Sequence, residues 1–157
     1  MQIATAAGRS PARELAAFCK NADNDGSSVW IIQGSRLTIS LMKSRIKGIP
    51  KLNSNDVYLV ISLRHRVSIL GDQPNTVIKA FIWIGSNVLK HQSKVERAVA
   101  CLEEVVADQR AKLRILIEYQ YCESFEFFTC FNQIDRVDSL KTPVQDRTKR
   151  AYFAIQY

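Results

Sequence analysis

The chain has 157 residues, of which 46% are hydrophobic and 24% are charged, a size and composition that suit one globular domain with its own core. Its apolar runs all fall short of the roughly 20 residues that a transmembrane helix needs. The net charge of +7 favours an acidic partner, which leaves open a protein, an anionic lipid surface and nucleic acid.

The first predicted elements are a short helix and two strands. A helix is expected over 11–20 because Pro11 suits the first position of a helix. The turn-rich segment 21–28 follows, and VWII at 29–32 then reads as a strand. Over 36–42 apolar and polar residues alternate, which is typical of a half-exposed strand.

Two continuous apolar runs, at 56–63 and 77–84, predict buried central strands. Between them, 64–75 is a hairpin-like excursion rich in turn residues. The second run ends in FIWIG, and Gly85 is predicted to turn the chain into a long amphipathic helix over about 92–109.

Three shorter elements follow the long helix. A strand is expected over 113–119, and a short helix lies within 123–131, where phenylalanines recur at helical spacing. The last stretch is polar and basic until AYFAIQY at 151–157, a candidate edge strand. Strands on both sides of one long helix indicate an α+β fold in which helices pack against a mixed sheet.

The apolar positions of the long helix predict which of its sides faces the sheet. The stripe consists of Val95, Val99, Leu102 and Val106. The core between sheet and helix is expected to hold Val57, Leu59, Val60, Ile82, Trp83, Val95, Val99 and Leu102. The residues placed away from this stripe are Lys94, Arg97, Ala98, Cys101, Glu104, Val105 and Asp108.

The sequence lacks the common motifs of enzymes, namely GxxxxGK[ST], GxGxxG, GxSxG and HExxH. His65 and His91 lie in a charged RHR and a polar KHQ, away from any obvious nucleophile. The cysteines show no C-x-x-C pair, which argues against zinc and for buried, reduced thiols in a cytosolic protein. They are Cys19, Cys101, Cys122 and Cys130. We therefore expect a binding module that is not an enzyme and has no cofactor.

Several motifs occur in a recognisable order along residues 12–133. VWII at 29–32 approximates an IWRV strand, NDVYLVI at 55–61 a GDxY strand, and FIWIG at 81–85 a strand that leads into a long helix. EYQYCESFEFFTCF at 118–131 resembles ExQGxESxxF, with Tyr121 and Cys122 in place of the usual glycine-containing turn. The positions in register there are Glu118, Gln120, Glu123, Ser124, Phe128 and Phe131. On these motifs the chain resembles a single domain of the gelsolin/villin family of actin-severing and capping proteins.

The resemblance implies a gelsolin-like mixed sheet of five to six strands between one long and one short helix. It divides the chain into a leader at 1–28, a gelsolin-like domain at 29–133 and a basic extension at 134–157. It also implies actin as the first partner, because the long helix of several family domains inserts its outer face into the barbed-end cleft of an actin subunit. The outward residues named above, with the small apolar flank Ala98, Cys101 and Val105, would then bind actin. A cytoplasmic, cytoskeleton-associated capping or sequestering module is expected.

The same resemblance bears on calcium. The shared calcium site of the family would use Asp56, but Gln92, or Ser93 in a shifted alignment, replaces the expected glutamate. Glu118 matches an acidic position of a second, actin-bridging calcium site, whose helix-end partner falls at 103–104. Because calcium needs several oxygen ligands, we expect no tight calcium binding, and Asp56 can equally cap a turn.

Two alternatives stay open. The gelsolin fold also serves as a structural module in larger assemblies, including vesicle-coat subunits, where it binds no actin. An anionic-lipid surface would instead suit a basic patch, since family members bind phosphoinositides through basic segments, although a charge run is also typical of a solvated face. The patch consists of Lys43, Arg45, Lys47, Lys51, Arg64 and Arg66. The basic stretches lack interleaved aromatic residues, which argues against nucleic acid.

Overall fold

The computed structural model describes residues 11–66 and 75–131. Within them lie five strands, β1 (Gly26–Gln33), β2 (Thr38–Lys43), β3 (Val57–His65), β4 (Thr76–Ile84) and β5 (Ala111–Tyr119). The helices are α2 (Pro11–Lys20), the 3-10 turn η1 (Ala22–Asn24), α3 (Gln92–Asp108) and α4 (Phe125–Thr129). No helix in the described ranges is long and apolar enough to cross a membrane.

The strands form one sheet in the order β2-β1-β3-β4-β5. All neighbours are antiparallel except β4 and β5, which are parallel and are joined through α3. The expected α+β fold with a mixed sheet is confirmed, and each expected strand and helix of the described ranges is present with its ends moved by a few residues. The candidate edge strand at 151–157 and most of the excursion at 64–75 lie outside the described residues.

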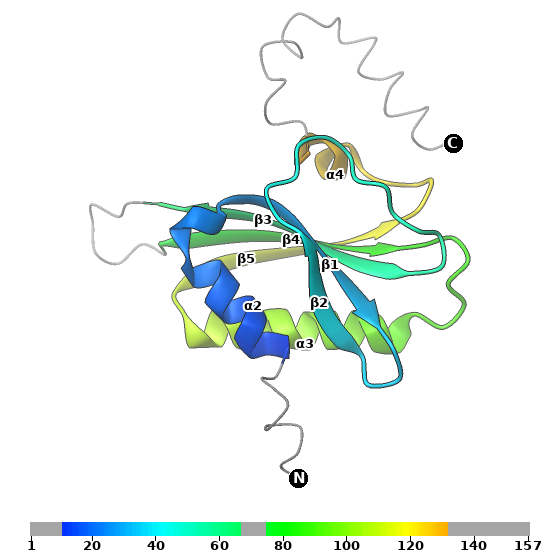
Figure 1. Cartoon of the computed structure of the whole chain (residues 1–157), viewed down its shortest axis with the longest axis horizontal. Coiled ribbons are helices and arrows are strands. Elements are labelled where there is room, and N and C mark those ends of the chain that lie inside the picture. Colours follow the sequence, from blue (N-terminus) through cyan, green and yellow to red (C-terminus); the bar gives the residue numbers. More distant parts are fainter. Residues whose placement is uncertain (1–10, 67–74, 132–157) are drawn as a thin grey trace, which may run out of the picture.

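The sheet separates two layers of helices, with α2 and α3 on one face and α4 on the other (Figure 1). Because side chains alternate along a strand, each central strand contributes to two cores. Leu59, Ile82 and Leu102 pack in the core under α2 and α3. Val60 and Trp83 instead pack in the core under α4. The expectation that all five would share one core is wrong, because a fully buried strand is covered on both faces.

Gly85 is required where β4 ends. Its backbone passes so close to the preceding loop that a Cβ at this position would collide with the Ser54 carbonyl. The Gly85 N–H donates to the carbonyl of Asp56 at 3.0 Å, and the Asn87 N–H donates to that of Ser54 at 2.9 Å. The glycine therefore lets the chain leave the sheet against the start of β3 and turn toward α3.

Candidate partner-binding surfaces

The outward face of α3 differs from the predicted one. Ala98, Cys101 and Val105, all expected to face a partner, are 0%, 2% and 0% exposed. They belong to the core beneath α2 and α3, and an ion pair of 2.7 Å between Lys20 Nζ and Asp108 Oδ2 joins the ends of the two helices. Because α3 packs against α2 as well as the sheet, its buried arc is rotated from the predicted stripe. The predicted exposure of these three residues is wrong.

The other predicted partner-binding residues have mixed surroundings. Glu104 is exposed, whereas Lys94 and Arg97 are half-buried. Asp108 is exposed but pairs with Lys20. Val95 and Val99, expected in the core, are only half-buried at its margin. Part of the predicted charged set therefore lies on the surface, whereas the predicted apolar flank of Ala98, Cys101 and Val105 is buried.

A different set of residues forms the exposed strip of α3. These residues recur at spacings of four, three and four, which places them along one side of a helix. The strip consists of Glu96, Ala100, Glu103 and Ala107. Half-buried Val99 and Val106 lie beside the two alanines in sequence. The strip combines small apolar side chains with carboxylates and was missed from the sequence.

Three of the four cysteine thiols are buried and one is exposed. Burial raises the pKa of Cys19 and of Cys130 to about 12. Burial also raises the pKa of the Cys101 thiol. Cys122, in the turn after β5, is exposed. The expectation of buried, reduced thiols holds for three residues and fails for Cys122.

Asp56 takes part in the junction between β3 and β4. Its N–H donates to the Asn53 carbonyl at 3.2 Å, and burial, aided by the Asp56 carboxylate, raises the pKa of the Tyr58 phenol. On α3, Gln92 Nε2 donates to Glu96 Oε2 at 3.5 Å. No group of three or more His, Cys, Asp or Glu side chains that could hold a metal occurs within 11–66 and 75–131. One carboxylate and one amide do not fit a calcium site.

Glu118 holds the start of α4. It is 3% exposed, and its two carboxylate oxygens accept the Ser124 N–H at 2.6 Å and the Ser124 hydroxyl at 3.0 Å. Ser124 is in turn the N-cap of α4, with its Oγ accepting the Phe127 N–H at 3.2 Å. Each oxygen of Glu118 thus accepts a hydrogen bond from Ser124, and within 11–66 and 75–131 neither Glu118 nor the predicted partners at 103–104 belong to a group of three metal-binding side chains.

A second buried carboxylate lies next to this cap. Glu123 is 4% exposed, and its Oε2 accepts the indole N–H of Trp83 at 2.9 Å. The Trp83 ring also packs against Tyr58 with centroids 5.6 Å apart. The tryptophan of FIWIG and the glutamate of ESxxF therefore contact each other, which gives these two sequence motifs a structural role in joining β4 to α4.

All six residues of the predicted basic patch are exposed. Arg45 donates to the Asp23 carbonyl at 2.6 Å. Arg64 and Arg66 flank His65, whose backbone N–H and Nδ1 both contact the carboxylate of Asp25. Arg45, Arg64 and Arg66 thus lie near the segment that leads into β1. Lys43 pairs with Val29 across the β1–β2 ladder, and Lys51 lies in the loop before β3.

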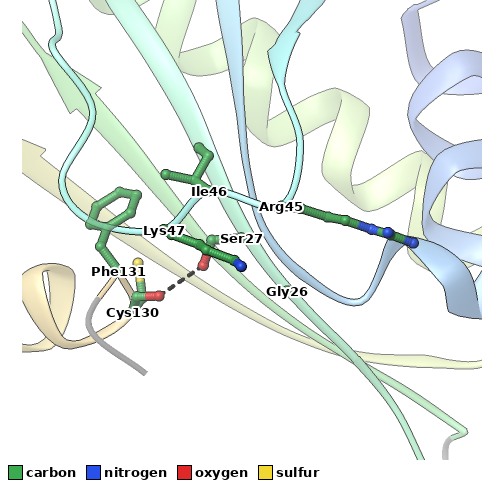
Figure 2. Close-up of a pocket in the computed structure, with 7 residues that line it drawn as sticks. All are labelled: Gly26, Ser27, Arg45, Ile46, Lys47, Cys130 and Phe131. Carbon is green, nitrogen blue, oxygen red and sulfur yellow. Dashed lines mark hydrogen bonds between the residues drawn. The ribbon is translucent and has the colours of Figure 1, made fainter. Parts of the chain in front are cut away.

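Arg45 and Lys47 also border a pocket of about 160 Å³ (Figure 2). Its other lining residues are Gly26, Ser27, Ile46, Cys130 and Phe131. The loop is fixed to β1 by the Ile46 N–H, which donates to the Ser27 carbonyl at 3.0 Å. The Ser27 hydroxyl donates to the Cys130 carbonyl at 2.8 Å. The pocket therefore lies where the basic loop, β1 and the end of α4 meet.

Comparisons with known proteins give fold-level likeness only. No protein-family model and no curated protein sequence matches the chain. A chain of the crystal structure of the Thorarchaeota 2DGel3/rabbit actin complex is similar with a TM-score of 0.43 and 17% identity, over 67% of this chain and 45% of that one. Mouse coactosin, described as an actin filament binding protein, is similar with a TM-score of 0.44 and 12% identity, over 87% of this chain and 99% of that one.

The chain thus spans less than half of the matched chain in the first structure. Both TM-scores are below 0.5, so neither similarity decides family or function. The resemblance to the gelsolin/villin family stays a prediction that rests on the sequence motifs.

Proposed function

We propose that this domain binds actin through the exposed strip of α3 formed by Glu96, Ala100, Glu103 and Ala107. Support for actin comes from the gelsolin-like motifs, which fall in order on β1, β3, β4, β5 and α4. The observation that carries the choice of surface is the burial of Ala98, Cys101 and Val105. Only the opposite side of α3 is left for a partner.

The chemistry of the strip suits a protein contact. Ala100 and Ala107 are exposed and small, so a partner can approach the helix backbone closely at these two positions. The carboxylates of Glu96 and Glu103 alternate with the alanines along the same side and offer hydrogen-bond acceptors. Half-buried Lys94 and Arg97 supply the opposite charge in the first turns of α3.

One helix face binds one actin subunit, so the expected activity is capping or sequestering. Severing a filament requires a second, simultaneous contact that a single face does not provide. Capping slows assembly from seeds at protein concentrations far below that of actin, whereas sequestering needs stoichiometric amounts. A pyrene-actin assembly assay with filament seeds separates the two.

Co-sedimentation with filaments, together with that assembly assay, tests the proposal. The protein is expected either to pellet with filaments or to reduce the assembled fraction, and to do so equally in EGTA and in calcium. If it does neither in either condition, actin binding is contradicted and the role of a structural subunit in a larger complex replaces it.

A further inference from the structure

The face of the sheet under α4 changes its chemistry halfway along the strands. Residues that pair across neighbouring strands form rows on this face. The two rows under α4 are Ile31–Tyr58–Trp83–Glu118 and Val29–Val60–Phe81–Leu116. The next two rows are Ser27–Ser62–Lys79–Arg114 and Arg64–Val77–Lys112. The apolar half packs against α4, and the other half is polar and cationic.

We call the part of this cationic half that lies on β3, β4 and β5 the ledge. It is formed by Ser62, Arg64, Val77, Lys79, Lys112 and Arg114. Its centre is balanced by one acid, because Glu126 Oε2 lies 2.7 Å from Lys79 Nζ and 2.6 Å from Arg114 Nη1. At its margin, Arg64 and Lys112 are exposed, and neither forms an ion pair with an acid of the described ranges. The ledge therefore carries free positive charge on two of its three strands.

Two walls and one pocket bound the ledge. One wall is α4, since the ring of Phe127 packs on Phe81, one row away, with centroids 5.5 Å apart. The other wall is the loop around Ile46, which is bonded to Ser27 of the third row. In the corner between them lies the 160 Å³ pocket. Figure 2 shows the side chains of Arg45 and Lys47 running from the loop in the same direction.

The shape of this surface selects among polyanions. Helix α4 covers the neighbouring half of the same face, and a helix with its side chains is about 10 Å in diameter, so a flat bilayer laid on this face would contact α4 first. No aromatic side chain belongs to the ledge rows, which removes the stacking platform that single-stranded nucleic acids use. Three strands span only about 10 Å between the outer two, which is about three residues of an extended chain, so one extended peptide can reach both Arg64 and Lys112.

The corner pocket adds an apolar contact to the charged ledge. Ile46, Cys130 and Phe131 line it with apolar surface, and its volume of about 160 Å³ is close to that of an engineered cavity of about 150 Å³ that takes up benzene. We propose that the ledge and this pocket bind an extended acidic peptide segment of a partner protein, with carboxylates on Arg64 and Lys112 and one apolar side chain in the pocket. The site lies on the opposite face of the sheet from α3 and does not depend on actin binding.

The test uses the full chain and fluorescein-labelled decapeptides in an anisotropy titration at low salt. The first probe is a glutamate-rich peptide with one central leucine, and its controls carry glutamine for glutamate or glycine for leucine. The glutamate peptide is expected to bind at least about tenfold more tightly than the glutamine peptide. Loss of the leucine should weaken binding about fivefold.

Reversing the charge of ledge residues tests whether the peptide binds at the ledge. The double variant Arg64→Glu/Lys112→Glu is expected to weaken binding of the glutamate peptide about tenfold or more. The matched control is Arg36→Glu/Lys90→Glu, which reverses two exposed cations in the β1–β2 turn and in the loop before α3. It should stay within twofold of wild type, and thermal unfolding checks that both variants fold.

Three results would overturn the proposal. If Arg64→Glu/Lys112→Glu binds the glutamate peptide as well as wild type, the positive charge of Arg64 and Lys112 does not contribute to peptide binding. Equal loss in the control variant would show non-specific attraction. The protein could instead bind phosphatidylserine vesicles or an oligothymidylate more tightly than the peptide. If Arg64→Glu/Lys112→Glu loses that binding, the surface is assigned to a membrane or to nucleic acid.

Discussion

Lys20 at the end of α2 and Asp108 at the end of α3 form an ion pair with a distance of 2.7 Å between Nζ and Oδ2. Both side chains are 52% exposed, so the pair itself contributes at most about 1 kcal/mol. The ion pair is informative because it accompanies the packing of α2 against α3. With α2 against α3, Ala98 is buried in the core and Ala100 faces outward.

This rotation of α3 is tested by two variants of the same chemistry. Ala98→Glu should lower the free energy of unfolding by about 3 kcal/mol or more, because a carboxylate is placed in an apolar core without a partner. Ala100→Glu should change it by less than about 0.5 kcal/mol, since both residues favour helices and the site is exposed. Urea unfolding measures both. Equal losses would mean that α3 is not oriented as described.

The bond between Trp83 and Glu123 gives a second stability prediction. Trp83→Phe removes the indole donor from a buried carboxylate and should cost about 1–3 kcal/mol beyond the loss of packing. The matched control is Trp30→Phe, because Trp30 is equally buried but donates to the neutral hydroxyl of Ser28 at 3.0 Å. If Trp83→Phe lowers the free energy of unfolding no more than Trp30→Phe does, the hydrogen bond between Trp83 and Glu123 does not contribute to stability.

The thiols should differ sharply in reactivity. Native protein is expected to react with a thiol reagent at pH 8 at Cys122 alone, because Cys19, Cys101 and Cys130 are buried with raised pKa values. All four should react in denaturant. Titration with a chromogenic disulfide counts them, and rapid labelling of two or more thiols in the native state would contradict the packing of the cores.

The same thiols predict a fall in stability at alkaline pH. The Cys19 thiol ionises near its ordinary pKa of 9.0 in the unfolded chain, whereas burial raises that pKa to about 12 in the folded protein. Between these values the unfolded state releases the proton first, so stability falls with rising pH by up to about 1.4 kcal/mol per pH unit for this group. Cys19→Ala should have a shallower slope than wild type between about pH 9 and 11. Parallel slopes would show that Cys19 is not buried.

No tight calcium binding is expected at Asp56. Gln92 offers an amide in place of the expected carboxylate and bonds to Glu96, and calcium at micromolar concentration needs more charged oxygen ligands than Asp56 alone supplies. Isothermal titration of the full chain is the measurement. Binding at micromolar calcium that disappears in Asp56→Asn would show an intact site.

The order of elements could be predicted from the sequence because each apolar run has a distinct period. The run ending in FIWIG and the stripe Val95, Val99, Leu102, Val106 were enough to place β4 and α3. The rotation of α3 was not predictable from that stripe alone. A second stripe, Ala98, Cys101, Leu102 and Val105, overlaps it, and only the packing of α2 decides between them.

The surfaces were harder to predict than the core for a related reason. Lys79 is far in sequence from Lys112 and Arg114, and only the pairing of β4 with β5 brings Lys79 beside Arg114. The predicted basic patch contained Arg64 but missed these neighbours, because runs of charge along the chain do not show charge gathered across strands. Glu118, which the family resemblance linked to a calcium site, accepts hydrogen bonds from Ser124 in the structure.

The central claim, that the exposed strip of α3 binds actin, is tested most directly by the affinity of two variants for monomeric actin. Ala100→Glu adds bulk and charge to the strip, whereas Ser40→Glu adds the same group on β2, on the opposite face of the sheet because its neighbour Ile39 packs in the core under α2 and α3. Fluorescence titration with labelled actin should show at least about tenfold weaker binding for Ala100→Glu and wild-type affinity for Ser40→Glu. Wild-type affinity in Ala100→Glu, with the fold intact, would contradict the account.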